Sequence, residues 1–121
     1  MSDSSVDAYA QVLKILHQMV VHLEENNGQR LKASQMLVQQ IFRDQILSAG
    51  IRFRESLSPG KLQSIHTEMS RDLRLLQTDL MFFSAARQHD TAQQRKQQVG
   101  DRLNRLIQYC EFILGEEHPS H

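Results

Sequence analysis

The spacing of apolar residues is the feature that most constrains the fold of this chain. Four segments carry apolar side chains three or four positions apart, and no segment shows a sustained alternation of apolar and polar residues. Steps of three and four place side chains on one face of an α-helix, whereas alternation is typical of a strand. The chain has 121 residues, which is the usual length of one domain. The sequence therefore predicts a single-domain, all-α, antiparallel four-helix bundle over residues 1–121, with frayed ends at about 1–4 and 115–121.

The first two helices are bounded by a cap and a polar turn. Ser4 can cap the first helix, and the sequence ENNG at 25–28 ends it. The second helix is expected over about 29–47. The segment that follows is too short and mixed for a helix, and we expect its apolar residues to plug the end of the bundle: Ile51, Phe53 and Leu57.

The third and fourth helices have clearer start signals. Ser58 followed by Pro59 is typical of a helix start, and this helix should continue to about Gln88. Asp90 can then cap the fourth helix, which Gly115 should close. The short link between them makes these two helices antiparallel neighbours.

The third helix carries more apolar surface than one neighbouring helix can cover. Its main stripe consists of Met69, Leu73, Leu76, Leu80 and Phe83, and a second stripe beside it consists of Leu75, Phe82 and Ala86. Counting outward from the short link places Leu80 opposite Val99. The same register brings Asp79 near Arg102, with Arg43 of the second helix as an alternative partner. We expect this ion pair to fix the register of the helices, since a bare carboxylate at a buried edge is costly.

One glycine interrupts the fourth helix. Gly100 costs roughly 1 kcal/mol relative to alanine in a helix interior. The register places it opposite Asp79 and two phenylalanines. We therefore expect it to let Phe82 or Phe83 approach the backbone closely.

Bulk charge and cysteine content restrict the environment of the protein. Fourteen basic and fourteen acidic residues give a formal net charge of zero, so no global field attracts nucleic acid or an anionic membrane. Cys110 is the only cysteine, has core spacing, and fits a reducing compartment. The first ten residues lack the regions of a signal peptide, and no apolar run approaches the roughly 20 residues of a membrane span. We expect a cytoplasmic protein that binds neither nucleic acid nor membrane.

Patterns of catalysis and metal binding are weak. His17 and His22 are five residues apart, which places them on different faces of a helix, and the sequence has no phosphate-binding glycine loop. His66 is similar to the phosphorylated histidine of four-helix phosphotransfer modules only in residue type, because TEMS follows it without the lysine and glycine those modules use. We expect no enzyme, no catalytic or metal-binding residue and no cofactor.

Basic residues line one side of the fourth helix and could receive an acidic peptide. Such a stripe is usually a solvated face. Met81 and Arg74 point away from both apolar stripes of the third helix, so Met81 is either a scattered surface group or part of a contact site. The two patches would serve one partner unless they lie too far apart around the bundle. The predicted partner-binding residues are Arg95, Arg102, Arg105, Met81 and Arg74, with Arg102 also the candidate structural partner of Asp79.

The second half of the chain carries a set of recognisable motifs. Between Thr67 and Leu114 these are EMSRDLRLL, DxMF, ARQxxTAQxR and RLxxLIQYC. They resemble the small cyanobacterial heterocyst-frequency control proteins of the PatD type, while the first half matches only in its helix spacing and in QxxFRDQI. The resemblance transfers no active-site residue. It implies a non-enzymatic regulator of cell division or differentiation frequency that binds another protein, with the tubulin-like division GTPase FtsZ, which typically offers regulators an acidic tail, as the partner it suggests.

A structural role is the competing interpretation. The wide apolar third helix could pack against itself in a homodimer, and the bundle would then be an oligomerising element without a regulatory ligand. A monomer would leave that surface for another protein. Sedimentation at micromolar concentration distinguishes the two.

Overall fold

The computed structural model describes residues 4–49 and 58–117, and in these ranges it contains helices and no strand. The four long helices are α1 (Ser4–Glu24), α2 (Gly28–Ile41), α3 (Pro59–Ala85) and α4 (His89–Glu117), and two short helical turns follow α2: the π-helix η1 (Phe42–Ile46) and the 3-10 helix η2 (Leu47–Ala49). The predicted all-α four-helix bundle is confirmed. The three residues expected to plug the bundle end, Ile51, Phe53 and Leu57, lie outside the described ranges.

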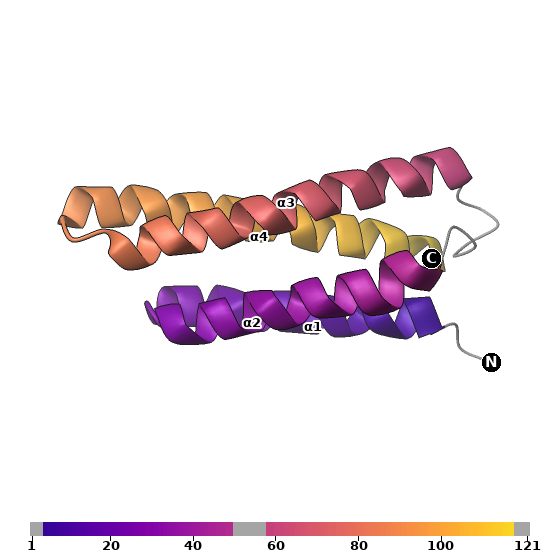
Figure 1. The fold of residues 1–121 in the computed structure, drawn as a ribbon, viewed down its shortest axis with the longest axis horizontal. Coiled ribbons are helices and arrows are strands. Elements are labelled where there is room, and N and C mark those ends of the chain that lie inside the picture. Colours follow the sequence, from indigo (N-terminus) through magenta and orange to yellow (C-terminus); the bar gives the residue numbers. More distant parts are fainter. Residues whose placement is uncertain (1–3, 50–57, 118–121) are drawn as a thin grey trace.

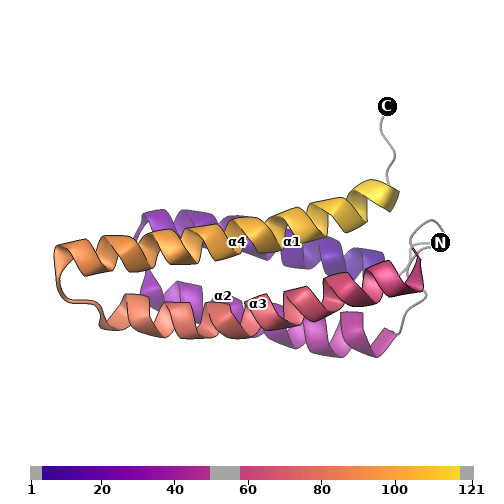
Figure 2. The same ribbon diagram turned by 90° about the horizontal axis from the view of Figure 1, so that it is seen from above.

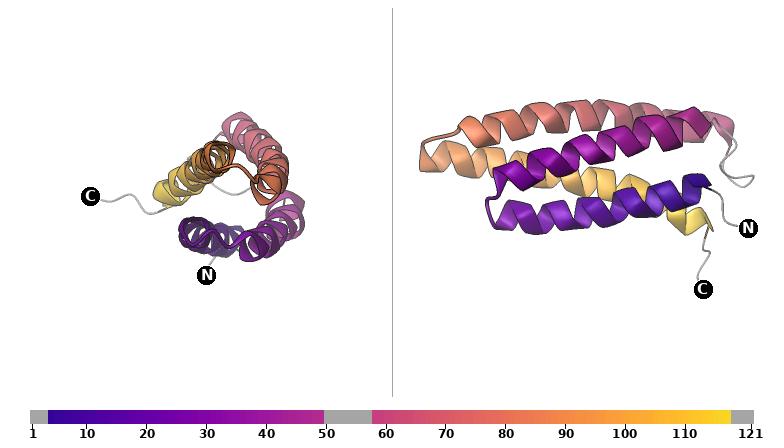
Figure 3. Two further views of the ribbon diagram at one scale, coloured as in Figure 1. Left: turned by 90° about the vertical axis from the view of Figure 1, so that its left-hand side faces the viewer. Right: turned by 60° about the horizontal axis from the view of Figure 1, so that its bottom comes forward.

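Each helix packs against its neighbours in sequence, and α4 closes the bundle against α1. Successive helices run in opposite directions, and the turn between α3 and α4 reaches beyond the turn between α1 and α2 (Figure 1). Seen from above, α4 lies over α1 and α3 lies over α2 (Figure 2). The end-on view shows the four helices at the corners of a quadrilateral (Figure 3). None of the helices in the described ranges is long and apolar enough to cross a bilayer.

Two asparagines form the tight turn between α1 and α2. Asn26 has a positive φ of 56°, the left-handed conformation that a helix C-terminus often needs. Its N–H donates to the carbonyl of Leu23 at 3.0 Å, and the N–H of Asn27 donates to the carbonyl of His22 at 2.9 Å. The side chain of Asn27 then accepts from the N–H of Arg30 at 3.1 Å and caps α2. The sequence ENNG therefore ends one helix and starts the next.

The start of α3 follows the predicted pattern. The hydroxyl of Ser58 accepts a hydrogen bond from the N–H of Lys61 at 3.1 Å, and Pro59 occupies the first turn. The end of the second predicted helix is different, because α2 stops at Ile41 and the chain continues through η1 and η2 to Ala49. The wider π-turn rotates the chain, and Phe42 and Ile46 at its ends are both buried.

The turn between α3 and α4 is placed differently from the prediction. Helix α3 ends at Ala85, three residues before the expected Gln88. The carbonyl of Gln88 accepts the N–H of Ala92 at 2.9 Å, so Gln88 rather than Asp90 holds the cap position of α4. Asp90 lies in the first turn instead, where its charge is favourable at the positive end of the helix dipole. At its other end α4 continues past Gly115 to Glu117, so residues 115–117 are helical and the prediction that they are frayed is wrong.

The core between α3 and α4 agrees with the predicted register. Eight residues that this register sets opposite one another are all buried: Met69, Leu73, Leu76, Leu80, Val99, Leu103, Leu106 and Cys110. On α1 the buried face is wide: Val12 and Met19 are fully buried, and Leu13 and Val20 beside them are partly buried. Helix α1 packs against both α2 and α4, and a helix with two neighbours buries a wider face.

The prediction for Gly100 is wrong. A Cβ built on Gly100 would lie 3.6 Å from Cδ2 of Leu23, which is ordinary van der Waals contact. The glycine thus faces α1 and not the phenylalanines of α3. Arg102 on the same helix points to α3, and two residues correspond to about 200° of rotation around an α-helix.

Candidate protein-interaction surface

An ion pair joins α3 to α4 where the register predicts it. Nε of Arg102 donates to Oδ2 of Asp79 at 3.0 Å. The Arg102 side chain is only 20% exposed, so it serves the fold and is poorly placed to contact a partner. The alternative cation, Arg43, lies at the surface of η1 and pairs with Asp44 at 3.1 Å.

A second carboxylate in this network is absent from the sequence-based prediction. Asp72 is fully buried, and its Oδ1 lies 3.1 Å from Nη1 of Arg102 and 3.5 Å from Nη1 of Arg105. Its other oxygen has no hydrogen-bond partner. The sequence spacing could have predicted that Asp72 is buried. It follows Met69 by three residues and precedes Leu76 by four, which places it on the same face as these core residues. Arg102 therefore bridges two carboxylates of α3.

The first arginine of the predicted stripe lies over an exposed ring. Cζ of Arg95 is 4.5 Å from the ring centroid of Phe82, and its Nη1 donates to Oε1 of Gln98 at 3.1 Å. Phe82 is 48% exposed, so the prediction that it belongs to a stripe packed on a second helix is wrong. Its ring is covered by a guanidinium instead, in a cation–π contact that is worth about 0.5–1 kcal/mol at an exposed site.

A similar pair lies at the opposite end of the same helix pair. Phe112 is 44% exposed, and Nζ of Lys61 is 5.7 Å from its ring centroid. Tyr109 lies one turn before it and is partly buried. Burial, followed by the nearby carboxylates of Asp72 and Glu68, raises the pKa of the Tyr109 hydroxyl. Aromatic groups are thus interspersed with charges along this side of the bundle.

These residues form one continuous surface, which we call the aromatic–cation face. On α4 the steps of three and four residues align Arg95, Gln98, Arg102, Arg105, Tyr109 and Phe112. From α3, Phe82 and Lys61 complete it through their contacts with Arg95 and Phe112. Within residues 4–49 and 58–117, Phe82 and Phe112 are the aromatic side chains among the exposed large hydrophobic groups. Aromatic residues and arginine are enriched at protein interfaces.

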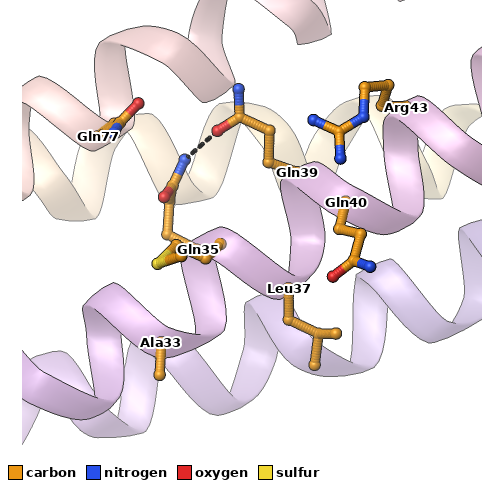
Figure 4. Close-up of a pocket in the computed structure, with 8 residues that line it drawn as sticks. Ala33, Gln35, Leu37, Gln39, Gln40, Arg43 and Gln77 are labelled. Carbon is orange, nitrogen blue, oxygen red and sulfur yellow. Dashed lines mark hydrogen bonds between the residues drawn. The ribbon is translucent and has the colours of Figure 1, made fainter.

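Met81 and Arg74 lie elsewhere. Both are exposed, Met81 to 60%. Met81 is two residues after Asp79, which is about 200° around the helix, so it lies away from α4. Gln77, one turn before Met81, lines a shallow groove between α3 and α2 (Figure 4). The five predicted partner-binding residues therefore belong to two separate surfaces.

This α2–α3 groove is rich in side-chain amides. Its lining consists of Ala33, Gln35, Met36, Leu37, Gln39, Gln40, Arg43 and Gln77. The buried Gln35 donates to the carbonyl of Leu73 at 3.2 Å and to Oε1 of Gln39 at 2.7 Å, the bond drawn in Figure 4. Gln35 thus ties α2 to α3 and orients the amide of Gln39 above it.

His66 is enclosed in the bundle. It is 7% exposed, its Nε2 forms a hydrogen bond with the hydroxyl of Tyr9, and the ring of Phe42 meets it edge-on at 5.7 Å. Burial lowers the pKa of His66, which favours the neutral imidazole. A phosphorylated histidine must be accessible, so this environment argues against the phosphotransfer alternative.

Other groups with chemical potential are equally enclosed or dispersed. Cys110 is fully buried, and burial, with a smaller effect of Glu111, raises the pKa of its thiol to about 12. The thiol is therefore protonated and behaves as a small apolar group. Across the described ranges, no three histidine, cysteine or acidic side chains gather as a metal site requires.

Comparisons with known proteins add no family to this description. No protein-family model, no curated protein and no solved structure matches the chain.

Proposed function

We propose that this chain is a non-enzymatic regulatory protein that acts in the cytoplasm and binds another protein through the aromatic–cation face. One observation carries the proposal. Phe82 and Phe112 leave nearly half of their surface exposed at the two ends of one stripe, and each ring lies beside a cation. An isolated exposed ring needs no explanation, but two on one face with arginine between them have the composition of binding hot spots.

The rigidity of this face supports the proposal. Arg102 joins Asp72 and Asp79 across the two helices, so the stripe on α4 is held in place before any partner binds. A preorganised surface loses less side-chain freedom on binding. Exposed ion pairs contribute only about 0–1 kcal/mol each, so Arg95 and Arg105 alone would bind an acidic segment weakly. The aromatic rings supply the apolar contact that affinity needs.

The resemblance of the second half of the chain suggests FtsZ as the partner, and a role in cell division or differentiation frequency. An acidic segment of such a partner would complement Arg95 and the half-exposed Arg105. Arg102 is excluded from direct contact because its charge is already matched by two carboxylates.

Binding to purified FtsZ tests the proposal. We expect Phe82→Ser combined with Phe112→Ser to weaken binding at least about tenfold, since each hot-spot side chain is worth about 1–2 kcal/mol or more. Arg95→Glu combined with Arg105→Glu should reduce both the affinity and its salt dependence. Val21→Ser is the matched control, because Val21 is an exposed apolar residue of α1 away from this face. The Phe82/Phe112 variant should retain wild-type helicity, and circular dichroism checks the arginine variant, because Arg105 also contacts the buried Asp72.

The results test the proposed surface and the proposed partner independently. Unchanged affinity of both double variants at low salt would show that the aromatic–cation face is not the interface. If the wild type does not bind FtsZ, that partner is wrong. The surface is then tested by comparing the proteins that the wild type and the Phe82/Phe112 variant capture from a native lysate.

The oligomerising alternative cannot use the main apolar stripe of α3. The main apolar stripe of α3 is buried within its own bundle, with Leu73, Leu76 and Leu80 at most 2% exposed. Those residues cannot also pack against a second copy of the helix. A stable dimer in sedimentation would have to use another surface.

A further inference from the structure

We propose that the α2–α3 groove is a second docking surface, and that it binds an acidic amphipathic helix of a partner protein. The inference goes beyond the proposed function, because the groove lies on the side of α3 away from the aromatic–cation face. It rests on three features of the groove: the exposed methionines, the excess of basic side chains around it, and the side-chain amides that line it.

Two methionines supply the anchors. Met36 is 68% exposed and Met81 is 60% exposed, the highest values among the exposed large hydrophobic residues of the described ranges. Met36 lines the groove together with Gln77, and Met81 follows Gln77 by four residues on the same side of α3. Met36 therefore lines the groove, and Met81 lies about one helical turn, or roughly 6 Å, along α3 from the lining residue Gln77. Flexible methionines on a surface suit the docking of a helix with apolar residues at i and i+4.

Basic side chains outnumber acidic ones around the groove, although Arg43 is the charged residue of its lining. Helix α2 contains no acidic residue from Gly28 to Ile41. Its Lys32 lines a separate hollow that also includes residues of α3, and Arg43 lines the groove itself. Arg74 is exposed and lies just under one helical turn before Gln77 on α3. Asp79 lies two residues after Gln77, but its carboxylate points to the opposite side of α3, where it pairs with Arg102. It therefore does not neutralise the cations around the groove. Arg43 has an acidic neighbour, the exposed Asp44. Charge complementarity therefore selects a partner rich in carboxylates.

The amides add oriented hydrogen-bond donors. Oε1 of Gln39 accepts from the buried Gln35, which orients the Gln39 amide, and its Nε2 can donate two hydrogen bonds. Figure 4 shows the Gln77 amide approaching from α3 and the Arg43 guanidinium beside Gln40, around the same groove. Donors of this kind match the carboxylates that would flank the apolar stripe of an acidic helix.

A synthetic peptide tests this surface directly. The probe is a helical peptide of about 18 residues, with two leucines four positions apart and glutamates around them. Its control has lysine in place of every glutamate. We expect fluorescence anisotropy to show binding of the acidic peptide to the full chain, at least about tenfold tighter than the basic one.

Variants of the full chain locate the binding. Met36→Ser combined with Met81→Ser should weaken the acidic peptide about tenfold or more, and Arg74→Glu should weaken it and reduce its salt dependence. Val21→Ser should bind as the wild type does. These positions are exposed, so the fold should persist, which circular dichroism checks. The Phe82/Phe112 variant should also bind normally, which keeps a failure here distinct from a failure of the proposed function.

Several results would overturn the inference. These are equal binding of the two peptides, no binding by the wild type, or unchanged binding by the Met36/Met81 variant. Loss of binding in the Phe82/Phe112 variant would assign the peptide to the other face. If sedimentation shows a wild-type dimer that the Met36/Met81 variant abolishes, the groove is occupied by a second copy of the chain.

Discussion

Gly100 illustrates what one residue contributes to this bundle. It is partly buried in the interior of α4, where glycine is the least favourable residue except proline. The space beside it accepts a methyl group, since a Cβ would rest 3.6 Å from Leu23. Nothing in the contacts of this position requires a missing side chain.

Gly100→Ala should therefore stabilise the protein by about 1 kcal/mol, because alanine has the higher helix propensity and its methyl group would pack against Leu23. The check is the free energy of unfolding in urea. Gly60→Ala is the control for a glycine near a helix start, where nothing lies within 4 Å of the added methyl and propensity matters less. A loss of stability in Gly100→Ala would show that α1 packs against α4 too closely at Leu23 to accept the methyl group.

At the scale of the elements, Arg102 is the residue on which the pairing of α3 and α4 depends. It neutralises two carboxylates, and one of them, Asp72, is fully buried. Removing the cation leaves Asp72 with only the longer contact to Arg105 at 3.5 Å. Removing Asp79, by contrast, leaves Arg102 still paired.

Arg102→Met should thus destabilise the fold by about 3–5 kcal/mol, because it strands a buried charge. Asp79→Asn should cost only about 1 kcal/mol, the net value of one hydrogen bond. Urea denaturation of the two variants measures the difference. The triple change of Asp72→Leu, Asp79→Leu and Arg102→Met should recover much of the loss, since no charge is then left without a partner. Equal effects of the two single variants would mean that Arg105 replaces Arg102 at Asp72.

The pairing of α3 with α4 could be predicted from the sequence because it depends on the length of the link between them. The link between α3 and α4 is so short that it fixes which residues lie opposite one another, and Asp79 and Arg102 meet as expected. The direction in which a residue points around the bundle depends on where the other helices lie, which spacing does not reveal. Gly100 and Phe82 were misplaced for that reason. The π-helix after Ile41 was also missed, since FRDQI has no composition that distinguishes a wide turn from an ordinary one.

At the scale of the whole molecule, the four-cornered arrangement gives α3 two separate outer surfaces. One adjoins α4 and carries the aromatic–cation face, and the other adjoins α2 and carries the groove with Met36. The sequence-based prediction contained the arginines of the first surface, and Arg74 and Met81 of the second. It did not contain Met36, Lys61 or Phe112, because a helical wheel gives angles and not neighbours. The two proposed docking surfaces are therefore separate and unlike in composition.

The enclosed contact between α1, η1 and α3 makes the stability of the whole bundle depend on pH. Tyr9, Phe42 and His66 come from these three elements and are buried together. Burial lowers the pKa of His66 below its ordinary value of 6.5, and it raises the pKa of the Tyr9 hydroxyl, which stays neutral. The unfolded chain therefore binds a proton at His66 before the folded chain does.

As the pH falls below about 6.5, the free energy of unfolding should decrease by as much as about 1.4 kcal/mol for each pH unit, until folded His66 is itself protonated. Above that pH the contribution of His66 is fully present. His66→Gln keeps an amide beside the Tyr9 hydroxyl but removes the titration, so it should flatten the profile between about pH 7.5 and pH 5.5, a range in which most carboxylates stay ionised. His17→Gln, at an exposed position of α1, is the matched control for the loss of one histidine. Urea denaturation at several pH values measures these slopes. If the wild type and His66→Gln lose stability in parallel, His66 is protonated equally in the folded and unfolded chain, and the contact between α1, η1 and α3 is open to water.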